Sequence, residues 1–284
     1  MTVQLLRSPG PDETRTPEQL WEQYLVEKDL AMKLRRAAKA ERAELYSSAY
    51  DELFRRVPHH SQLSKKASPA QRARRISLQI ALLRPWLTPQ TTFLEVGAGD
   101  CALSLALAEK VAHVYAIDVS AAITPTTLPE NFTLVLSDGT SIPVPEGRIT
   151  VAYSNQLMEH LHPDDALDQL TNIYRALAPD GVYICVTPNR LTGPHDISRY
   201  FDTVATGFHL KEYTFTDLSA TFRRVGFRTV HQCFRKGSTY VRVPGPLARC
   251  AERAIERLPR GLQKRASTTR LVRGLLDLRL IARK

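Results

Sequence analysis

A glycine-containing turn is the first feature of the sequence that could bind a ligand. In the stretch FLEVGAGDCALS, Gly97 and Gly99 follow an apolar run, and Ala102 opens a helical pattern. Glycine has no Cβ, so its backbone can approach a bound molecule closely. The spacing also passes the dinucleotide-binding fingerprint, which accepts glycine or alanine at its third position. The turn therefore indicates a nucleotide-like cofactor and leaves its identity open.

Three acidic residues help to choose that cofactor. Asp118 ends the next apolar run, in the position of an acid that binds a ribose, and Asp138 ends the third run. Glu95 stands two residues before Gly97, where a carboxylate would repel a pyrophosphate that approaches the helix N-terminus. Glu95 thus favours a positively charged cofactor without phosphate over a nicotinamide dinucleotide.

In these segments the sequence resembles class I S-adenosylmethionine-dependent methyltransferases of the small-molecule, methyltransferase type 11-like group. FLEVGAGDC, YAIDVS and LSDGTSIP resemble the first three motifs, and the segment from VAYSNQLMEHL to VTPN resembles the fourth and fifth. Cys101 departs from the family, which often has a third glycine there. The resemblance implies S-adenosyl-L-methionine as the cofactor, with Asp118 on the ribose hydroxyls, Asp138 on the adenine amino group, and Glu95 orienting the turn or the methionine amino group. The residues expected to bind it are Glu95, Gly97, Ala98, Gly99, Asp118, Val119, Asp138, Gly139, Ser154 and Asn155.

Strand and helix patterns alternate from Thr92 onward, and the strands are rich in Val, Ile and Leu. This alternation predicts an α/β fold with a parallel sheet covered on both faces. The resemblance implies a Rossmann-like, doubly wound sheet of seven strands, mostly parallel, whose last strand runs antiparallel. Ser68 and Thr214 are expected to cap helices. The domain prediction is a disordered start (1–17), an N-terminal helical cap (18–90), a methyltransferase core (91–241), a basic helical insertion (242–273) and a final core strand (274–284).

A long connector follows the fifth expected strand, over residues 190–213. Loops this long are usually functional or disordered, and the aromatic and ionisable residues here argue against disorder. We expect an acceptor pocket, with His195 as the first candidate for a general base and Asp196 as its orienting partner, although a merely structural turn is the alternative for His195. His160, after the fourth strand, is the second catalytic candidate. The expected acceptor-binding residues are Tyr200, His209, Tyr46 and Tyr50.

Charge is distributed unevenly along the chain of 284 residues, whose net charge is +10. Residues 235–284 contain 14 Lys/Arg against 3 Asp/Glu, whereas residues 91–200 contain 5 against 13. Nucleic acid is nevertheless an unlikely substrate, since Ser-Asn-Gln-Leu at 154–157 lacks the two prolines and aromatic residue typical of base-amine methyltransferases. The basic segment 247–273 could instead contact an anionic membrane, with Leu247, Cys250 and Ile255 on its apolar face, or pack on the domain with its arginines in solvent.

The remaining expectations concern compartment and function. The four cysteines lack CxxC spacing and are expected to be small buried residues in a reduced cytoplasm, and no metal site and no obligate protein partner are expected. The leading hypothesis is methyl transfer to a small-molecule acceptor, with a modest preference for a hydroxyl oxygen of a sugar or glycoconjugate, a natural product or a lipid-like molecule. The alternatives are a membrane-surface or non-catalytic protein on a methyltransferase scaffold and, less favoured, an NAD(P)-dependent oxidoreductase.

Overall fold

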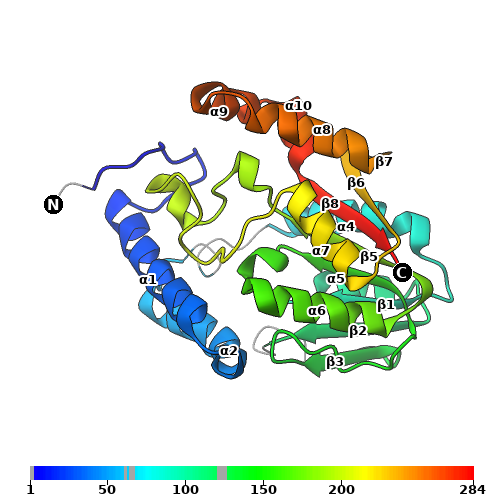
Figure 1. Cartoon of the computed structure of the whole chain (residues 1–284). Helices are drawn as coiled ribbons and strands as arrows, with labels where there is room; N and C mark the ends of the chain where they lie inside the picture. The colour runs from blue at the N-terminus through cyan, green and yellow to red at the C-terminus, as the bar shows by residue number, and fades with distance from the viewer. Residues whose placement is uncertain (1–2, 61–62, 64–67, 120–126) are drawn as a thin grey trace.

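A twisted, mostly parallel sheet forms the centre of the protein in this computed structural model, which describes residues 3–60, 63, 68–119 and 127–284 (Figure 1). Within these residues the sheet has eight strands in the order β3-β2-β1-β4-β5-β8-β6-β7. The strands are β1 (Thr92–Val96), β2 (His113–Asp118), β3 (Phe132–Leu136), β4 (Ile149–Asn155), β5 (Leu177–Thr187), β6 (Thr229–Lys236), β7 (Thr239–Val243) and β8 (Leu278–Arg283).

The sheet agrees with the predicted α/β class and with the antiparallel last strand. Strands β1 to β5 pair in parallel, whereas β8 is antiparallel to both β5 and β6. The prediction of seven strands missed β7, which forms a hairpin with β6 around the turn at Gly237. This hairpin extends the sheet by one strand and leaves the positions of the other seven unchanged.

Alternating strand residues face two separate apolar cores, as the two-residue period of a strand requires. Leu94 and Tyr183 pack with α6 (Pro163–Ala176) and α7 (Phe215–Val225) on one face. Phe93 and Tyr153 pack with α4 (Pro69–Leu83) and α5 (Ala102–Ala108) on the other face. Both faces are therefore covered by helices, which explains why the strands read as nearly continuous apolar runs.

The N-terminal helices divide between two places. Helices α1 (Pro17–Arg36) and α2 (Lys39–Arg56) lie beside the loop after β5, at the end of the sheet where β1, β4 and β5 finish (Figure 1). Helix α4 belongs to the core instead, although the expected cap extended to residue 90; Ser68 caps it as predicted. The start, expected to be disordered, contacts this same loop, since the Leu6 N–H donates to the Tyr200 carbonyl at 2.8 Å.

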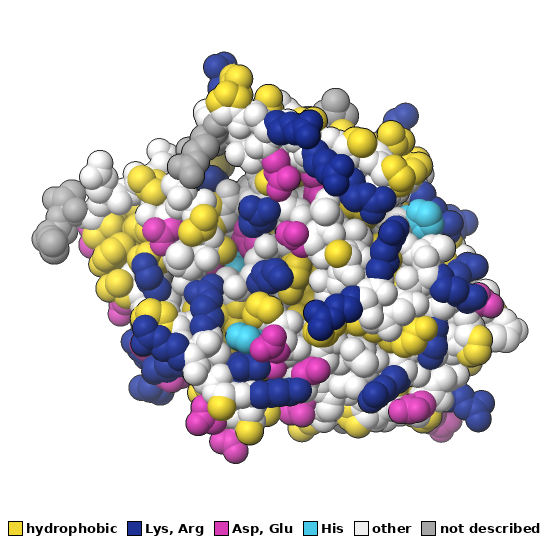
Figure 2. Space-filling model, in the orientation of Figure 1, with side chains coloured by type: hydrophobic (Ala, Val, Ile, Leu, Met, Phe, Trp, Pro, Cys, Tyr) yellow, Lys and Arg dark blue, Asp and Glu magenta, His cyan; other side chains and the backbone are white. Residues whose placement is uncertain are grey.

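The basic insertion forms helices α8 (Gly245–Glu256), α9 (Arg260–Thr268) and α10 (Arg270–Leu276). Basic side chains lie in a row over the α8 end of the molecule (Figure 2). The predicted apolar face of α8 is partly wrong, because Leu247 and Cys250 are exposed. Its buried face carries Ala248, Glu252 and Ile255. Among the described residues, no helix is long and apolar enough to cross a bilayer.

Candidate functional site

The glycine turn after β1 has the geometry that its sequence predicts. Gly97 and Gly99 have φ angles of 75° and 52°, in the left-handed region that glycine adopts without cost. The N–H groups of Gly97 and Ala98 both donate to the Ile117 carbonyl, at 2.8 and 3.0 Å. These bonds fix the turn against the end of β2. The turn is thus a preformed surface at the carboxyl end of the sheet, where ligands of open α/β folds bind.

Asp118 ends β2 beside this turn. Its Oδ2 accepts the Gly99 N–H at 2.7 Å, so the acid expected to bind the ribose also holds the glycine turn in place. A carboxylate has further acceptor capacity for hydroxyl groups. Val119 is partly buried and packs against the core next to Asp118. The position and chemistry of Asp118 therefore fit the ribose of S-adenosylmethionine.

Glu95 is buried beneath the turn. Its Oε2 accepts a hydrogen bond from the Ser104 hydroxyl of α5 at 2.6 Å, which ties β1 to the helix that follows the turn. Burial disfavours the charged form and raises the pKa of Glu95 to about 7. The contact with Ser104 is the one that the structure gives Glu95, and its predicted roles toward the turn or the methionine amino group stay predictions.

The raised pKa of Glu95 predicts that the stability of the ligand-free protein falls between about pH 4.5 and pH 7. The folded state holds the proton more tightly than the unfolded state, so ionisation destabilises the fold as the pH rises through this window. Glu95→Gln should remove this contribution, which is about 3 kcal/mol at most. Urea unfolding at pH 5 and pH 8 measures the free energy of unfolding of both proteins. The variant should be more stable relative to wild type at pH 8 than at pH 5. The same difference between variant and wild type at both pH values would contradict a raised pKa of Glu95.

Cys101 occupies a strained position at the start of α5. Its φ is 53°, in the left-handed region, and its side chain is fully buried. This conformation explains why glycine is common at this position in the family that the sequence resembles. The short thiol packs in the α4–α5 core, which offsets the backbone cost. Cys101 is therefore accommodated as the N-cap residue of α5.

Asp138 and Gly139 form the turn after β3. The Asp138 Oδ1 accepts the N–H groups of Thr140 and Ser141 at 2.8 and 2.7 Å. These bonds lower the pKa of Asp138 despite its partial burial. The ring of Tyr46 lies 3.1 Å from where a Cβ on Gly139 would stand. The carboxylate thus shapes its own loop, and its predicted contact with adenine stays a prediction.

Ser154 and Asn155 end β4 and point in different directions. The Ser154 hydroxyl lies 2.6 Å from the Tyr183 hydroxyl, inside the core. Asn155 instead lines a hollow of about 430 Å³ between α4 and the strands, together with Arg74, Arg235 and Arg279. The Ser154 side chain is therefore used inside the core, and the predicted contacts of Ser154 and Asn155 with the cofactor stay predictions.

The predicted pairing of His195 with Asp196 is not found. The His195 Nε2 lies 3.1 Å from the Asn189 carbonyl and 2.8 Å from the Thr192 hydroxyl, so its ring joins the turn that follows β5. Asp196 instead accepts the N–H groups of Ser198 and Gly207. Burial lowers the pKa of His195, which keeps the ring neutral.

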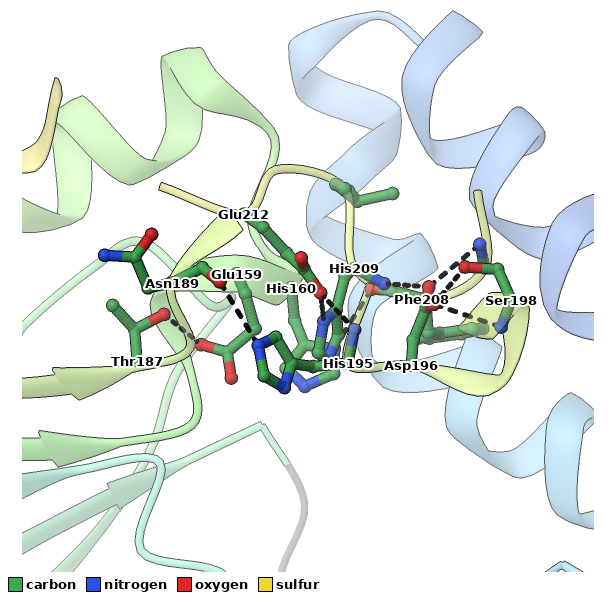
Figure 3. Close-up of polar contacts among 12 residues, drawn as sticks. Glu159, His160, Thr187, Asn189, His195, Asp196, Ser198, Phe208, His209 and Glu212 are labelled. Atoms are coloured by element: carbon green, nitrogen blue, oxygen red, sulfur yellow. Dashed lines mark hydrogen bonds and ion pairs between the residues drawn. The ribbon is translucent and has the colours of Figure 1, made fainter. Parts of the chain in front are cut away.

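The connector instead brings His209 and Glu212 next to residues that follow β4. The His209 Nδ1 lies 2.7 Å from Glu212 Oε1, and its ring centroid lies 4.9 Å from that of His160. Glu159 precedes His160 and is fully buried (Figure 3). We call Glu159, His160, His209 and Glu212 the polar cluster. Glu159 and Glu212 are not among the site residues predicted from the sequence, although the His-x-x-Glu spacing at 209–212 brings His209 and Glu212 onto one side of a turn.

Electrostatics in the polar cluster follow from burial. Desolvation raises the pKa of Glu159 to about 7 and lowers that of His160 to about 3. The carboxylates of Glu212, Glu159 and Asp196 outweigh burial at His209 and raise its pKa. The polar cluster therefore contains one imidazole that gains a proton readily and one that stays neutral.

Three predicted acceptor-binding tyrosines occupy different environments. Tyr46 donates to Asp165 Oδ2 at 2.7 Å and accepts the His162 N–H at 2.8 Å, so its hydroxyl joins α2 to α6. Tyr200 is buried with Tyr24 in the packing between α1 and the connector. Tyr50 packs against Phe208, with ring centroids 5.2 Å apart. Of the three, Tyr50 lies against the polar cluster.

Comparisons with known proteins identify the family. A methyltransferase-domain family model matches residues 69–232, more than half of the chain. A protein of Mycolicibacterium smegmatis named as a probable S-adenosylmethionine-dependent methyltransferase is 31% identical over 86 residues, which cover 30% of this chain. That match spans 31% of the relative's length.

Solved structures show the same fold. A Burkholderia thailandensis 1,6-didemethyltoxoflavin-N1-methyltransferase, determined with 1,6-didemethyltoxoflavin and S-adenosylhomocysteine, is 19% identical with a TM-score of 0.51, over 87% of this chain and 91% of that one. A chain from the complex of the Haloferax volcanii Trm112 methyltransferase activator with a methyltransferase is 15% identical with a TM-score of 0.52, over 73% and 88%. The chain belongs to the methyltransferase-domain family, and its cofactor is S-adenosylmethionine.

Proposed function

We propose that the protein transfers the methyl group of S-adenosylmethionine to a hydroxyl oxygen of a small-molecule acceptor held at the polar cluster. The acceptor oxygen forms a bond to the methyl carbon while the carbon–sulfur bond breaks. The electron pair of the broken carbon–sulfur bond stays on sulfur, which gives S-adenosylhomocysteine. The proton of the acceptor hydroxyl passes to a base or to solvent. Alignment of the three atoms can supply about 7–11 kcal/mol of the barrier.

The observation that carries this proposal is the place of Tyr50. Burial raises its pKa, and the carboxylates of Glu27, Glu159 and Asp118 raise it further. The Tyr50 ring centroid lies 6.3 Å from that of His160, so Tyr50 packs against the polar cluster while it also senses the charge of Asp118 on the cofactor side. This placement supports an acceptor site beside the transferable methyl group.

A hydroxyl acceptor suits the polar cluster because its oxygen must lose a proton during transfer. Buried imidazole and carboxylate groups with shifted pKa values are typical of sites that move protons. The basic hollow beside Asn155 is a less suitable acceptor site than the polar cluster, because the two lie against opposite faces of the sheet. Leu82 and Tyr153 of the hollow belong to the α4–α5 core. Met158, next to Glu159, belongs to the core on the other face.

Transfer of a labelled methyl group to pools of hydroxylated sugars, natural products and lipid-like acceptors tests the proposal. In His209→Gln we expect turnover to fall by a factor of about 100 or more, with S-adenosylhomocysteine binding unchanged. His113→Gln, at the amino end of β2, is the control and should keep wild-type turnover. If His209→Gln stays active while His195→Gln does not, catalysis depends on His195, the base first predicted from the sequence.

A non-catalytic or membrane-surface role for the scaffold is the competing proposal. The basic segment 247–273 keeps exposed Leu247 and Leu262, which an anionic membrane could bind. Sedimentation with anionic vesicles at low and high salt tests this contact. Salt-sensitive binding without methyl transfer to any acceptor pool would favour the membrane role over the enzymatic one.

A further inference from the structure

We propose that Glu159, His160 and His209 bind a divalent transition-metal ion that holds the acceptor oxygen. One ligand atom from each residue lies within 4.8 Å of the other two. Two imidazole nitrogens and one carboxylate oxygen form a common ligand set for zinc and iron(II) sites that keep positions open for substrate. The role toward the acceptor rests on the proposed function, whereas metal binding itself does not.

The hydrogen bonds of the two histidines use Nδ1 of each ring and leave Nε2 for coordination. The His160 Nδ1 lies 3.0 Å from the Phe208 carbonyl, which can only accept, so Nδ1 donates and Nε2 keeps its lone pair. The His209 Nδ1 donates to Glu212 Oε1 at 2.7 Å, so Nε2 is the nitrogen left for an ion, which would displace the proton that the raised pKa favours there. A backbone carbonyl and a carboxylate are the usual outer partners of metal-binding histidines, because they fix the ring and the tautomer.

Glu159 provides a second, independent observation. Its side chain is fully buried, and Oε2 accepts from the Thr187 hydroxyl at 2.8 Å. Oε1 is buried without a hydrogen-bond partner among the described residues. An unpaired buried carboxylate oxygen is unfavourable, because it has lost its hydrogen bonds to water without gaining others. A cation bound between Oε1 and the two imidazoles would remove this cost (Figure 3).

The backbone around the polar cluster brings the ligands together from two distant segments. Glu159 and His160 lie in the short helix η2 (Met158–His160), directly after β4. The Lys211 N–H donates to the Glu159 carbonyl at 3.1 Å, which fixes the connector near His209 against η2. The three donor atoms already lie within 4.8 Å of one another, and each would lie about 2.0–2.2 Å from a bound ion. The ion would therefore join the connector to η2.

The ion defines the acceptor chemistry. Three protein ligands leave coordination positions for an acceptor oxygen, and metal coordination lowers the pKa of a bound hydroxyl. The proton then passes to solvent, and the metal-bound oxygen attacks the methyl carbon as described above. An acceptor with two neighbouring oxygens, such as a vicinal diol or a hydroxy-carbonyl group, would chelate the ion and fit this site best.

Titration of the chelator-treated full-length protein with Co²⁺, followed by calorimetry and visible absorption, tests the site without any methyl acceptor. We expect one ion per chain with visible bands of nitrogen and oxygen coordination. Glu159→Gln, His160→Gln and His209→Gln should each weaken binding at least a hundredfold. Glu212→Gln should weaken it by a factor of about 10–100, since it removes only an outer partner.

His113→Gln is the control for adventitious binding and should leave the affinity unchanged. Binding of S-adenosylhomocysteine by each variant shows that the fold and the cofactor site persist, and three separate ligand variants guard against one that fails to fold. Absence of binding, or binding that survives all three substitutions, overturns the metal site. Metal binding without methyl transfer to any acceptor would refute the proposed function and leave the metal site standing.

Discussion

Asp118→Ala should weaken S-adenosylhomocysteine binding at least a hundredfold. The carboxylate is expected to accept both ribose hydroxyls, and hydrogen bonds to a charged group contribute about 1.5–3 kcal/mol each. Loss of two such bonds corresponds to a factor of about 100 or more in affinity. Isothermal titration calorimetry of the purified protein measures the change directly.

Two comparison variants separate ligand recognition from support of the turn. Asp118→Asn keeps an oxygen that can accept the Gly99 N–H, so it should retain the turn while losing the charge. Asp164→Ala removes an exposed carboxylate in the first turn of α6 and should bind like wild type. Equal affinity of Asp118→Ala and wild type would show that Asp118 serves only the glycine turn.

The cofactor side of the site could be predicted from the sequence because its residues are tied to strand ends. Glu95 and Asp118 lie in β1 and β2, whose positions follow from local apolar patterns. The glycine turn follows from residues that are adjacent in the chain. Parallel pairing then places these elements at one edge of the sheet. Local pattern and the rule for open α/β sheets were therefore sufficient to place these residues at one edge of the sheet, whereas their contacts with the cofactor stay predictions.

The acceptor side could not be predicted to the same depth, because it depends on how the connector folds. His195 and Asp196 are neighbours in sequence, yet one bonds to the Asn189 carbonyl and the other to Gly207. His209 meets His160 only after the connector returns to η2. No periodic pattern encodes this return, since irregular backbone is held by contacts between distant segments.

The basic insertion shows a different limit of sequence reasoning. The positions of apolar residues along α8 predict that the side with Leu247 and Cys250 packs against the protein. Both residues are exposed instead. The buried face instead carries Glu252, a charged residue that no hydrophobic pattern selects. Glu252 accepts from the first N–H groups of α7, so we expect this contact to set how α8 is rotated against the core.

Glu252→Ala should lower the free energy of unfolding by several kcal/mol, because it leaves buried donors without an acceptor at about 1–3 kcal/mol each. The Glu252 carboxylate accepts the Phe215 N–H and, through Oε2, the Thr216 N–H and hydroxyl, both at 2.9 Å. It also accepts the Asn189 side-chain amide at 3.1 Å. A carboxylate at these first N–H groups of α7 is further stabilised by the helix dipole.

Glu256→Ala, one helical turn later, is the matched control. Glu256 pairs with Arg190 at 3.3 Å on the surface, and such exposed pairs contribute at most about 1 kcal/mol. Urea unfolding followed by circular dichroism should therefore separate the two variants clearly, with Glu252→Gln between them because its amide oxygen still accepts. If Glu252→Ala unfolds like Glu256→Ala, α8 is not held through the N-terminus of α7, and its rotation must come from Ala248 and Ile255 alone.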